Sequence, residues 1–283
     1  MASKATGFLA LENRYIIEGN LKFDGAVHIG SGYEGAGSDA EFVRGAFKAK
    51  QPFLPGSSLR GVLRSTLERI LQAAKPESAC VLFAKESHGS CLTVKENYDI
   101  LKLLWEESRV SPAEREKQLM ESLSGDGQCD VCKLFGSPLM ASKLRIDDCK
   151  LHDGGKSAVR HGVGIDRDTE TASPQIKYDF ETFDGGPRFH LRMQIENAGQ
   201  SDLALLGVLL HEMREGIQVG GKRSCGLGRC KLEGYQVSYF DKATVLDFLK
   251  TGKPKAMNDF ETRVLGPAMD AYFKGGAHAA ATA

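Results

Sequence analysis

Two successive strand–helix–strand segments constrain the fold of this chain most. Apolar residues alternate with polar ones over 189–195, as in a half-buried strand, and leucines recur at helical spacing over 203–213. Earlier in the chain, 14–29 predicts two short strands around an Asp-Gly turn, and a helix follows over 57–71. Further strands are predicted over 41–44, over 142–151 and up to Tyr239, and one or two helices after it. This order predicts an α+β fold of the ferredoxin-like (RRM-like) type, decorated by large insertions.

The composition is that of an ordinary globular protein, and it narrows the function classes. Lysine and arginine number 37 together, as do aspartate and glutamate, so the net charge is zero. That balance argues against a nonspecific nucleic-acid binder but allows basic residues gathered on one face. No apolar run is long enough to cross a bilayer, and the first ten residues are too weakly apolar for a secretory signal. We therefore expect no membrane partner and a cytoplasmic location, where the seven cysteines stay reduced.

Two nucleotide-binding motifs are matched only in part. Residues 30–35 fit the G-x-G-x-x-G fingerprint, but the next helix starts about twenty residues later, whereas that fingerprint must open a helix. Residues 216–223 resemble a P-loop, but Arg223 stands where a hydroxyl should bind magnesium. Both interpretations are rejected.

The cysteines of an apparent insertion, 80–141, indicate a metal site. A Cys-x-x-Cys pair at its end and further cysteines and a histidine before it favour tetrahedral zinc. The predicted ligands are Cys80, Cys91, Cys129 and Cys132, with His88 as an alternate for one of them. Buried free thiols remain the alternative. The insertion has little sustained apolar patterning, so a metal would account for its order.

Two glycine-containing segments carry basic residues suited to a phosphate backbone. The start of the first helix offers free backbone amides, hydroxyls and cations, from Ser57, Ser58, Arg60 and Arg64. A later loop lets a sugar-phosphate chain approach closely, through Gly220, Gly221, Lys222, Arg223 and Arg229. The alternatives are structural: Ser57 caps its helix, as Asp202 caps the second one, and the loop is a hairpin turn with surface cations.

Four segments together resemble the RAMP superfamily, and within it the backbone subunits of type III CRISPR effectors. They are the Pro-Gly-Ser-Ser helix opening in 53–61, the Cys-x-x-Cys segment 129–137, the Gly-Ile-Asp-Arg segment 164–167 and the glycine-rich loop 220–229. All four occur in family order, and the resemblance covers roughly residues 14–240.

The resemblance implies an endoribonuclease subunit that binds CRISPR guide RNA and cuts target RNA. Its partners would be these two RNAs, other copies of the same chain and other effector subunits. Its cofactors would be structural Zn²⁺ and catalytic Mg²⁺ or Mn²⁺. A non-catalytic scaffold subunit and a nuclease that processes precursor guide RNA remain alternatives. The latter would need a general base such as His28 or His161.

The resemblance also assigns the cleavage residue to Asp39, which lies upstream of the helix opening. It would hold a divalent metal or orient the RNA 2′-hydroxyl toward the adjacent phosphate. Glu34, Asp166 and Asp168 are rivals for this role. A loop acid that stabilises an Asx-turn is the structural alternative.

A polar arm over 153–186 is too long for an ordinary connection and is expected to be functional. By resemblance it is a thumb hairpin that reaches across the guide–target duplex, with Arg160 and Arg167 as RNA contacts. The expected core consists of residues 14–79 and 142–240, with the insertion 80–141 between its two parts. C-terminal helices over 241–274 and a disordered tail over 275–283 are expected to follow.

Overall fold

The computed structural model describes residues 10–32, 38–45, 51–81, 91, 128–137 and 140–274, the side chains of 173–176 excepted. Glu34, His88, the helix predicted from Ser111 and the tail 275–283 lie outside the described residues. None of the helices in the described part of the chain has the length and apolar character needed to cross a membrane.

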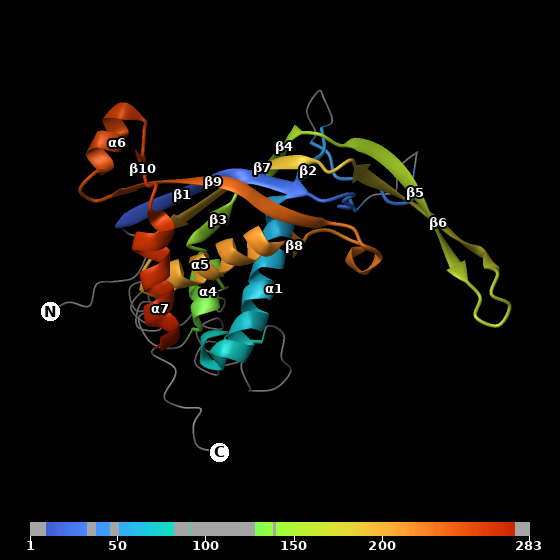
Figure 1. Cartoon of the computed structure of the whole chain (residues 1–283), viewed down its shortest axis with the longest axis horizontal. Coiled ribbons are helices and arrows are strands. Elements are labelled where there is room, and N and C mark those ends of the chain that lie inside the picture. The colour runs from blue at the N-terminus through green and yellow to red at the C-terminus, as the bar shows by residue number, and fades with distance from the viewer. Residues whose placement is uncertain are drawn as a thin grey trace, which may run out of the picture.

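An antiparallel sheet forms the centre of the fold, with β1 (Asn13–Phe23) in its middle (Figure 1). One edge of β1 pairs with β7 (Arg188–Glu196) and the other with β9 (Arg229–Asp241), while β4 (Cys149–Asp153) pairs with β7. Short strands extend this sheet, namely β2 (Phe53–Leu54), β3 (Leu144–Ile146), β8 (Ile217–Gln218) and β10 (Lys255–Ala256). The resulting order is β10-β9-β1-β7-β4-β2, so the two strand–helix–strand segments interleave.

Helices cover one face of the sheet (Figure 1): α1 (Gly56–Ala74), α4 (Asp130–Phe135), α5 (Gln200–Glu215) and α7 (Gly266–Lys274). Every fourth residue of α1 from Leu59 to Leu71 is fully buried, which forms an apolar stripe along the helix. Alternate residues of β1, such as Ile17 and Leu21, meet this stripe in one core. Three short turns of helix connect the elements: η1 (Pro76–Ser78), η2 (Arg223–Cys225) and the π-helical η3 (Glu261–Leu265).

Two elements extend beyond this layered core, at opposite ends of the molecule (Figure 1). At one end, α6 (Val245–Thr251) lies on the other side of the sheet, where Phe248 stacks on Phe240 of β9 with ring centres 4.1 Å apart. At the other end, β5 (Lys156–Ile165) and β6 (Ala172–Asp184) form a two-stranded hairpin, called the ribbon below. The long polar arm predicted over 153–186 is therefore a hairpin, and the strand predicted over 189–195 is confirmed as β7.

Two of the short strands predicted near the N-terminus are wrong. In the described residues, 26–29 and 41–44 form isolated bridges and no strand. Val27 bridges to Phe183 of the ribbon, and both Val27 and Phe42 are buried in the core. Their apolar spacing therefore reflects core packing beneath the ribbon, which imitates the alternation of a strand.

Two further details differ from the sequence prediction. The strand predicted over 142–151 is divided into β3 and β4, because Asp148 leaves the ladder and bonds to the backbone of α1. Ser57 lies inside α1 and makes no side-chain cap. Gly199 precedes α5, and Asp202 lies in its first turn, where Oδ2 accepts the backbone N–H of Gly199 at 2.9 Å.

Candidate functional site

Several segments meet where the ribbon joins the sheet, at a place called the junction below. They are 26–30, 38–45, the base of the ribbon and the glycine-rich loop 219–228. Glu181 of β6 ties two of them together: it accepts the backbone N–H of Phe42 (2.8 Å) and binds Nη1 of Arg44 (2.9 Å). Because the Glu181 side chain is only 13% exposed, this charge-assisted pairing holds 38–45 against the ribbon.

Asp39, the predicted cleavage residue, lies at the junction with an exposed side chain. Its Oδ2 accepts the backbone N–H of Asp179 on β6 at 2.9 Å. The Asp179 carboxylate in turn lies 2.6 Å from Nδ1 of His161. One oxygen of Asp39 therefore fixes the loop to the ribbon, while Oδ1 makes no hydrogen bond to any residue that the structure describes. Asp39 is both a positioned carboxylate and part of the loop's structure.

The rival acids Asp166 and Asp168 lie at the tip of the ribbon. Asp166 Oδ1 accepts the backbone N–H groups of Thr169 (2.9 Å) and Asp168 (3.0 Å). The hydrogen bonds from Thr169 come first among the causes that hold the pKa of Asp166 below its ordinary value. Asp166 thus stabilises the turn at the tip, whereas Asp39 contacts the ribbon nearer its base.

His28 connects the ribbon to the glycine-rich loop. Its Nδ1 lies 2.6 Å from the carbonyl oxygen of Glu181, so Nδ1 carries the proton and donates. Its own carbonyl accepts the backbone N–H of Gly221 at 2.9 Å. Gly220 has φ +94°, and a Cβ there would lie 2.2 Å from that carbonyl oxygen. Only glycine fits at position 220, and this close approach places the basic loop beside the ribbon.

Lys222 of the glycine-rich loop contacts the ribbon at the junction. It adopts the left-handed conformation (φ +57°), and its Nζ lies 4.3 Å from the centre of the Tyr178 ring and 5.3 Å from that of Phe180. A lysine over two aromatic faces is a cation–π contact. Tyr178 is 39% exposed, whereas Phe180 is buried, so the arrangement offers a phosphate the charge of Lys222 and offers a base the ring of Tyr178, as in binding of single-stranded nucleic acid. The structure therefore brings together Asp39, Gly220, Gly221 and Lys222 of the predicted site.

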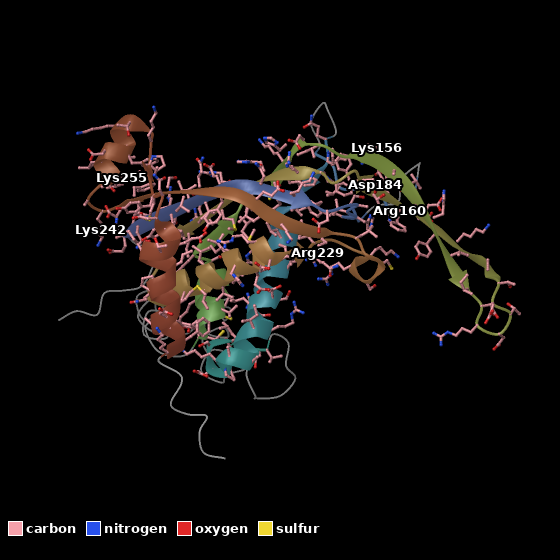
Figure 2. All side chains as sticks on the ribbon, in the orientation of Figure 1. Lys156, Arg160, Asp184, Arg229, Lys242 and Lys255 are labelled. Carbon is pink, nitrogen blue, oxygen red and sulfur yellow. The ribbon has the colours of Figure 1, made fainter. Side chains whose placement is uncertain are left out.

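The remaining arginines predicted to bind RNA on the ribbon and the loop differ in their partners. Arg160 pairs with Asp184 (3.2 Å) and Arg229 with Asp24 (3.2 Å); Figure 2 labels both arginines. Arg167 at the ribbon tip and Arg223 on the loop are exposed, with no ion pair to any described residue. Arg167 lies away from the junction, so the structure does not bring it to Asp39.

The start of α1 already has an anionic partner. The backbone N–H of Gly56 donates to Asp148 Oδ1 at 2.9 Å, and a Cβ at Gly56 would lie 2.3 Å from the carbonyl oxygen of Ile146. This helix end, predicted to bind phosphate, is packed against the segment between β3 and β4. Ser57 is exposed and Ser58 half-buried beside it. RNA contact by the two serines stays a prediction.

Arg60 and Arg64 of α1 point to α4 instead of to the junction. Arg60 donates to the carbonyl of Phe135, and Arg64 Nη1 to that of Gly136 at 3.1 Å. Arg64 Nη2 also lies 3.3 Å from Sγ of Cys132. Burial lowers the pKa of Arg60. Both side chains stabilise the packing of α4 on α1, and RNA contact by them is untested.

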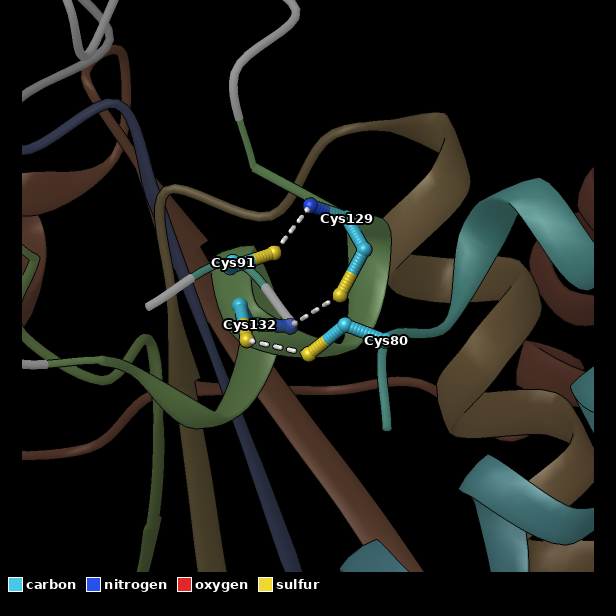
Figure 3. A group of neighbouring side chains, drawn as sticks. All are labelled: Cys80, Cys91, Cys129 and Cys132. Atoms are coloured by element: carbon cyan, nitrogen blue, oxygen red, sulfur yellow. Dashed lines mark hydrogen bonds between the residues drawn. The ribbon is translucent and has the colours of Figure 1, made fainter. Parts of the chain in front are cut away.

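The four predicted cysteine ligands meet at the start of α4 (Figure 3). Their sulfur atoms all lie within 4.8 Å of one another, and Cys80 and Cys132 are 3.6 Å apart. Four sulfurs at about 2.3 Å from a tetrahedral zinc would be about 3.8 Å apart, so the cluster fits that ion. Three of the four residues are buried, and Cys129 is half-buried. The grouping is confirmed, and the cluster could bind a metal such as zinc.

Hydrogen bonds within this cluster lower the pKa of two of the thiols and raise that of the other two, so that Cys91, like Cys132, holds its proton more firmly, first because of its bond to Cys129. Bonds from Cys129 and Cys132 lower the pKa of Cys80, and a bond from Cys132 lowers that of Cys129 to about 7. The pKa of Cys132 is raised, first by its bond to Cys129. Thiolate is the form that binds zinc. Among the described residues no second group of three or more such ligands forms, at Asp39 or elsewhere.

Glu181 and Phe180 have roles that the sequence did not predict. Glu181 fixes the Asp39 loop, and Phe180 lies under Lys222 and packs edge-on to His28, with ring centres 5.4 Å apart. The run Tyr-Asp-Phe-Glu at 178–181 alternates aromatic and acidic residues, and that pattern could have indicated two functional faces of one strand.

Comparison with known families agrees with this geometry. The model of the RAMP superfamily matches residues 20–231, a range that includes the junction and all four clustered cysteines. No curated protein matches the chain.

Proposed function

Because the chain belongs to the RAMP superfamily, we propose that it is a guide-RNA-binding backbone subunit of a type III CRISPR ribonucleoprotein. Members of this superfamily are associated with RNA binding in CRISPR systems. In this proposal the subunit cleaves target RNA paired to the guide. Its partners are guide RNA, target RNA, further copies of the chain and other effector subunits.

The proposal includes a ferredoxin-like core and a structural zinc ion. The strand order β9-β1-β7-β4 supports such a core, because α1 follows β1 in the chain, α5 follows β7, and both helices lie on the same face of the sheet. Cys80, Cys91, Cys129 and Cys132 would hold Zn²⁺, which would fix the insertion to α1 without taking part in cleavage.

One observation carries the functional proposal: the Asp39 loop, the ribbon and the basic glycine-rich loop meet at the junction. A neutral chain binds RNA where its cations gather, and Lys222 and Arg223 provide that charge beside Tyr178 and Phe180. A base stacked on the ribbon would place its phosphate near Lys222 and its sugar near 38–45. Contacts to backbone and rings read no sequence, as binding to any guide requires.

At the junction Asp39 would act on the RNA 2′-hydroxyl. Cleavage forms a bond from the 2′-oxygen to phosphorus and breaks the bond to the 5′-oxygen. The products are a 2′,3′-cyclic phosphate and a 5′-hydroxyl: the 2′ proton passes to water, and water returns a proton to the leaving 5′-oxygen. Asp39 orients the hydroxyl by accepting its hydrogen bond through Oδ1. A divalent ion, Mg²⁺ or Mn²⁺, would neutralise developing charge there, an inference that rests on the resemblance alone.

A second candidate is a scaffold subunit that binds RNA without cutting it. The bond from the backbone N–H of Asp179 to Asp39 favours it, since it gives this carboxylate a structural use. His28, with Nδ1 committed to Glu181 and Nε2 left as an acceptor, is the residue that a guide-processing nuclease would use.

The test is cleavage of labelled target RNA by the reconstituted guide complex with magnesium, comparing wild type, Asp39→Ala and Asp39→Asn. Asparagine keeps an acceptor for the Asp179 N–H but carries no charge. Loss of cleavage in both variants, with target binding retained, supports a cleaving Asp39. Cleavage retained in Asp39→Asn and lost in Asp39→Ala would make Asp39 a positioning residue. Wild type that binds but does not cut would establish the scaffold.

A further inference from the structure

One stretch of β9, at the edge of the sheet, has no neighbouring strand on its outer side in the part of the chain that the structure describes (Figure 1). At one end of the stretch, β8 pairs with Arg229 and Cys230, and at the other end β10 pairs with Ser238 and Tyr239. Between these ends, residues 231–236 form backbone hydrogen bonds to no described segment other than β1. An open strand edge of this kind can receive an added strand.

The register shows which backbone groups of this stretch are open. Residues that pair with one neighbouring strand alternate with residues that point to the other side of an antiparallel strand. Val237 at the β10 end and Cys230 at the β8 end both point away from β1. Tyr235 and Leu232, two residues inward from these, therefore point away from β1 too, and the bulge at Gly234 takes up the extra residue between them.

A groove of about 950 Å³, called the β9 groove below, follows this edge. Its lining includes Gln236 from the open face of the sheet, Leu232 and Val237 from the face under the helices, and residues 256–262 opposite them. Because side chains of both faces of β9 line it, the groove runs along the edge of the strand. Met257 still donates its N–H to Val237 at 2.8 Å, and after it the chain leaves β9 and enters η3. The groove begins where this segment departs from the strand.

Glu261 fixes the wall of the groove that lies opposite the strand. Tyr235 Oη and Arg214 Nη1 both donate to its Oε1, at 2.5 and 2.6 Å. The hydrogen bonds from Tyr235 and Arg214 hold the pKa of Glu261 below its ordinary value, so this carboxylate is charged at neutral pH. The wall is therefore in place before anything binds, which lowers the cost of ordering on binding.

The residues that line the groove give it an acidic rim. Glu18, Glu215, Asp259 and Glu261 line it together with Arg214. Arg214 is committed to Glu261, and Glu215 has no ion pair to any described residue. The other two acids pair with arginines outside the groove, and such surface pairs are weak. An acidic rim attracts a basic segment, whereas it repels RNA and the same edge of a second copy.

We propose that the β9 groove binds an extended segment of a partner protein, which adds a strand to β9 and carries lysine or arginine side chains to the acidic rim. Main-chain hydrogen bonds to Leu232 and Tyr235 supply affinity, and the carboxylates select a basic sequence. The inference goes beyond the proposed function and does not depend on it, because none of the residues that line the groove belongs to the junction.

The test measures binding of a labelled synthetic peptide that alternates lysine and valine, a pattern that favours an extended chain. Fluorescence anisotropy follows its binding to the whole chain. Two control peptides should bind about tenfold more weakly: one alternates glutamate and valine, and the other keeps the lysines but carries N-methyl groups that block main-chain hydrogen bonds. Equal binding of all three peptides would overturn the proposal.

Hydrogen exchange with and without the lysine–valine peptide locates the binding site. The amides of Leu232 and Tyr235 should exchange more slowly when the peptide is bound, because a new strand accepts their N–H groups. Bound peptide that leaves exchange over 231–236 unchanged would overturn strand addition.

Gly234→Asn blocks the groove from within β9. Gly234 lines the groove and has φ +46°, which asparagine tolerates, and no described atom lies within 4 Å of a Cβ there. Gly252→Asn is the matched control, because φ is +67° and the space is equally open, but Gly252 ends α6 outside the groove. We expect Gly234→Asn to weaken peptide binding about tenfold at an unchanged unfolding temperature, and Gly252→Asn to bind like wild type. Equal affinities of the two variants would overturn the proposal.

A charge variant tests the rim without changing the backbone of β9. Glu215→Lys/Asp259→Lys should lose the lysine–valine peptide and gain the glutamate–valine peptide. Asp247→Lys on α6 is the control and should keep the preference of wild type. All three acids are exposed, so the variants should fold. An unchanged preference in the double variant would show that the rim does not select a basic partner, and would overturn the proposal.

Other occupants of the groove are further outcomes of the same experiment. Dimers of wild type that Gly234→Asn abolishes in sedimentation velocity would assign the edge to a second copy and overturn the proposal. RNA binding that this variant weakens in a mobility shift would assign the groove to RNA, with the same consequence. Unchanged sedimentation and RNA binding, with peptide binding lost, support a protein partner. Wild type that binds the peptide but no RNA would refute the proposed function alone.

Discussion

The start of α1 and the loop before β9 both combine glycine with basic residues, yet their cations face opposite ways. Arg60 and Arg64 turn inward to the carbonyls of Phe135 and Gly136. Lys222 instead reaches over the ribbon, and Arg223 is exposed. The same residue types therefore serve packing in one region and an open, basic surface in the other.

The difference follows from which backbone carbonyls lack a partner. The carbonyls at the end of the six-residue helix α4 receive no backbone N–H from a further turn of the helix. Arg60 and Arg64 supply the missing donors. In the loop, the carbonyls of Lys222 and Arg223 accept the N–H groups of Cys225 and Gly226. Those carbonyls need no cation, so the side chains stay available. Whether a lysine or arginine side chain points into the fold or to the surface therefore depends more on nearby unpaired acceptors than on the sequence motif in which it stands.

Removing the metal ligands should have the largest effect, because α4 starts at the cluster and presents the carbonyls that hold Arg60 and Arg64. Structural zinc sites contribute an apparent binding free energy on the order of 10 kcal/mol. We expect Cys132→Ser to lose bound zinc and to have a sharply lowered unfolding temperature, and we expect a chelator to have the same effect on wild type. Zinc per chain is measured by atomic emission. The exposed Cys225→Ser is the control, and equal zinc content in both variants would contradict the site.

Arg64→Ala should come next, with a loss of about 3 kcal/mol of unfolding free energy. The change leaves the Gly136 carbonyl and the Cys132 sulfur without their charged donor. Chemical denaturation measures the loss. Arg69→Ala, exposed on the same helix, should change stability by less than about 0.5 kcal/mol. If Arg64→Ala instead leaves stability intact and weakens RNA binding, the inward assignment of this arginine is wrong.

Gly220→Ala should weaken both stability and RNA binding moderately, by about 2 kcal/mol in unfolding free energy. Its φ of +94° and the carbonyl oxygen of His28, 2.2 Å from an added Cβ, force the loop away from the ribbon. Gly226→Ala is a matched control, because φ is +85° there but nothing lies within 4 Å of the Cβ. Comparable RNA affinities of the two variants would mean that contact with His28 does not position the loop.

Local periodicity predicted most of the core. The alternation in β7 and the leucines of α1 and α5 need only their own neighbours to be recognised, and these elements lie where they were expected. The grouping of the four cysteines was also predictable, since few other residue types combine in that spacing to make one site. Features of this kind can be predicted because the residues that produce them are recognisable from residue type and spacing alone.

The sequence could not predict features that depend on partners far along the chain. Glu181 binds Arg44 across 137 residues, and Asp148 reaches Gly56 across 92. Arg64 meets Gly136 across 72. Each pairing exists because the fold brings an unsatisfied donor to an acceptor, and no motif of either segment contains its partner. For this reason the sequence did not predict that Arg60 and Arg64 bind the carbonyls of Phe135 and Gly136.

Lys222→Ala should have the smallest effect on stability, and it tests most directly whether the glycine-rich loop contacts RNA. Exposed cation–π contacts contribute about 0.5–1 kcal/mol, so the unfolding temperature should hardly change. RNA affinity should fall several-fold, and the slope of log affinity against log salt should decrease by about one, since one phosphate contact is lost. Lys231→Ala on the sheet should leave that slope unchanged. If both substitutions decrease the slope equally, RNA contacts the open face of the sheet as well as the junction. The basic surface would then extend from the glycine-rich loop onto β9, and the contrast with the start of α1 would no longer concern the loop alone.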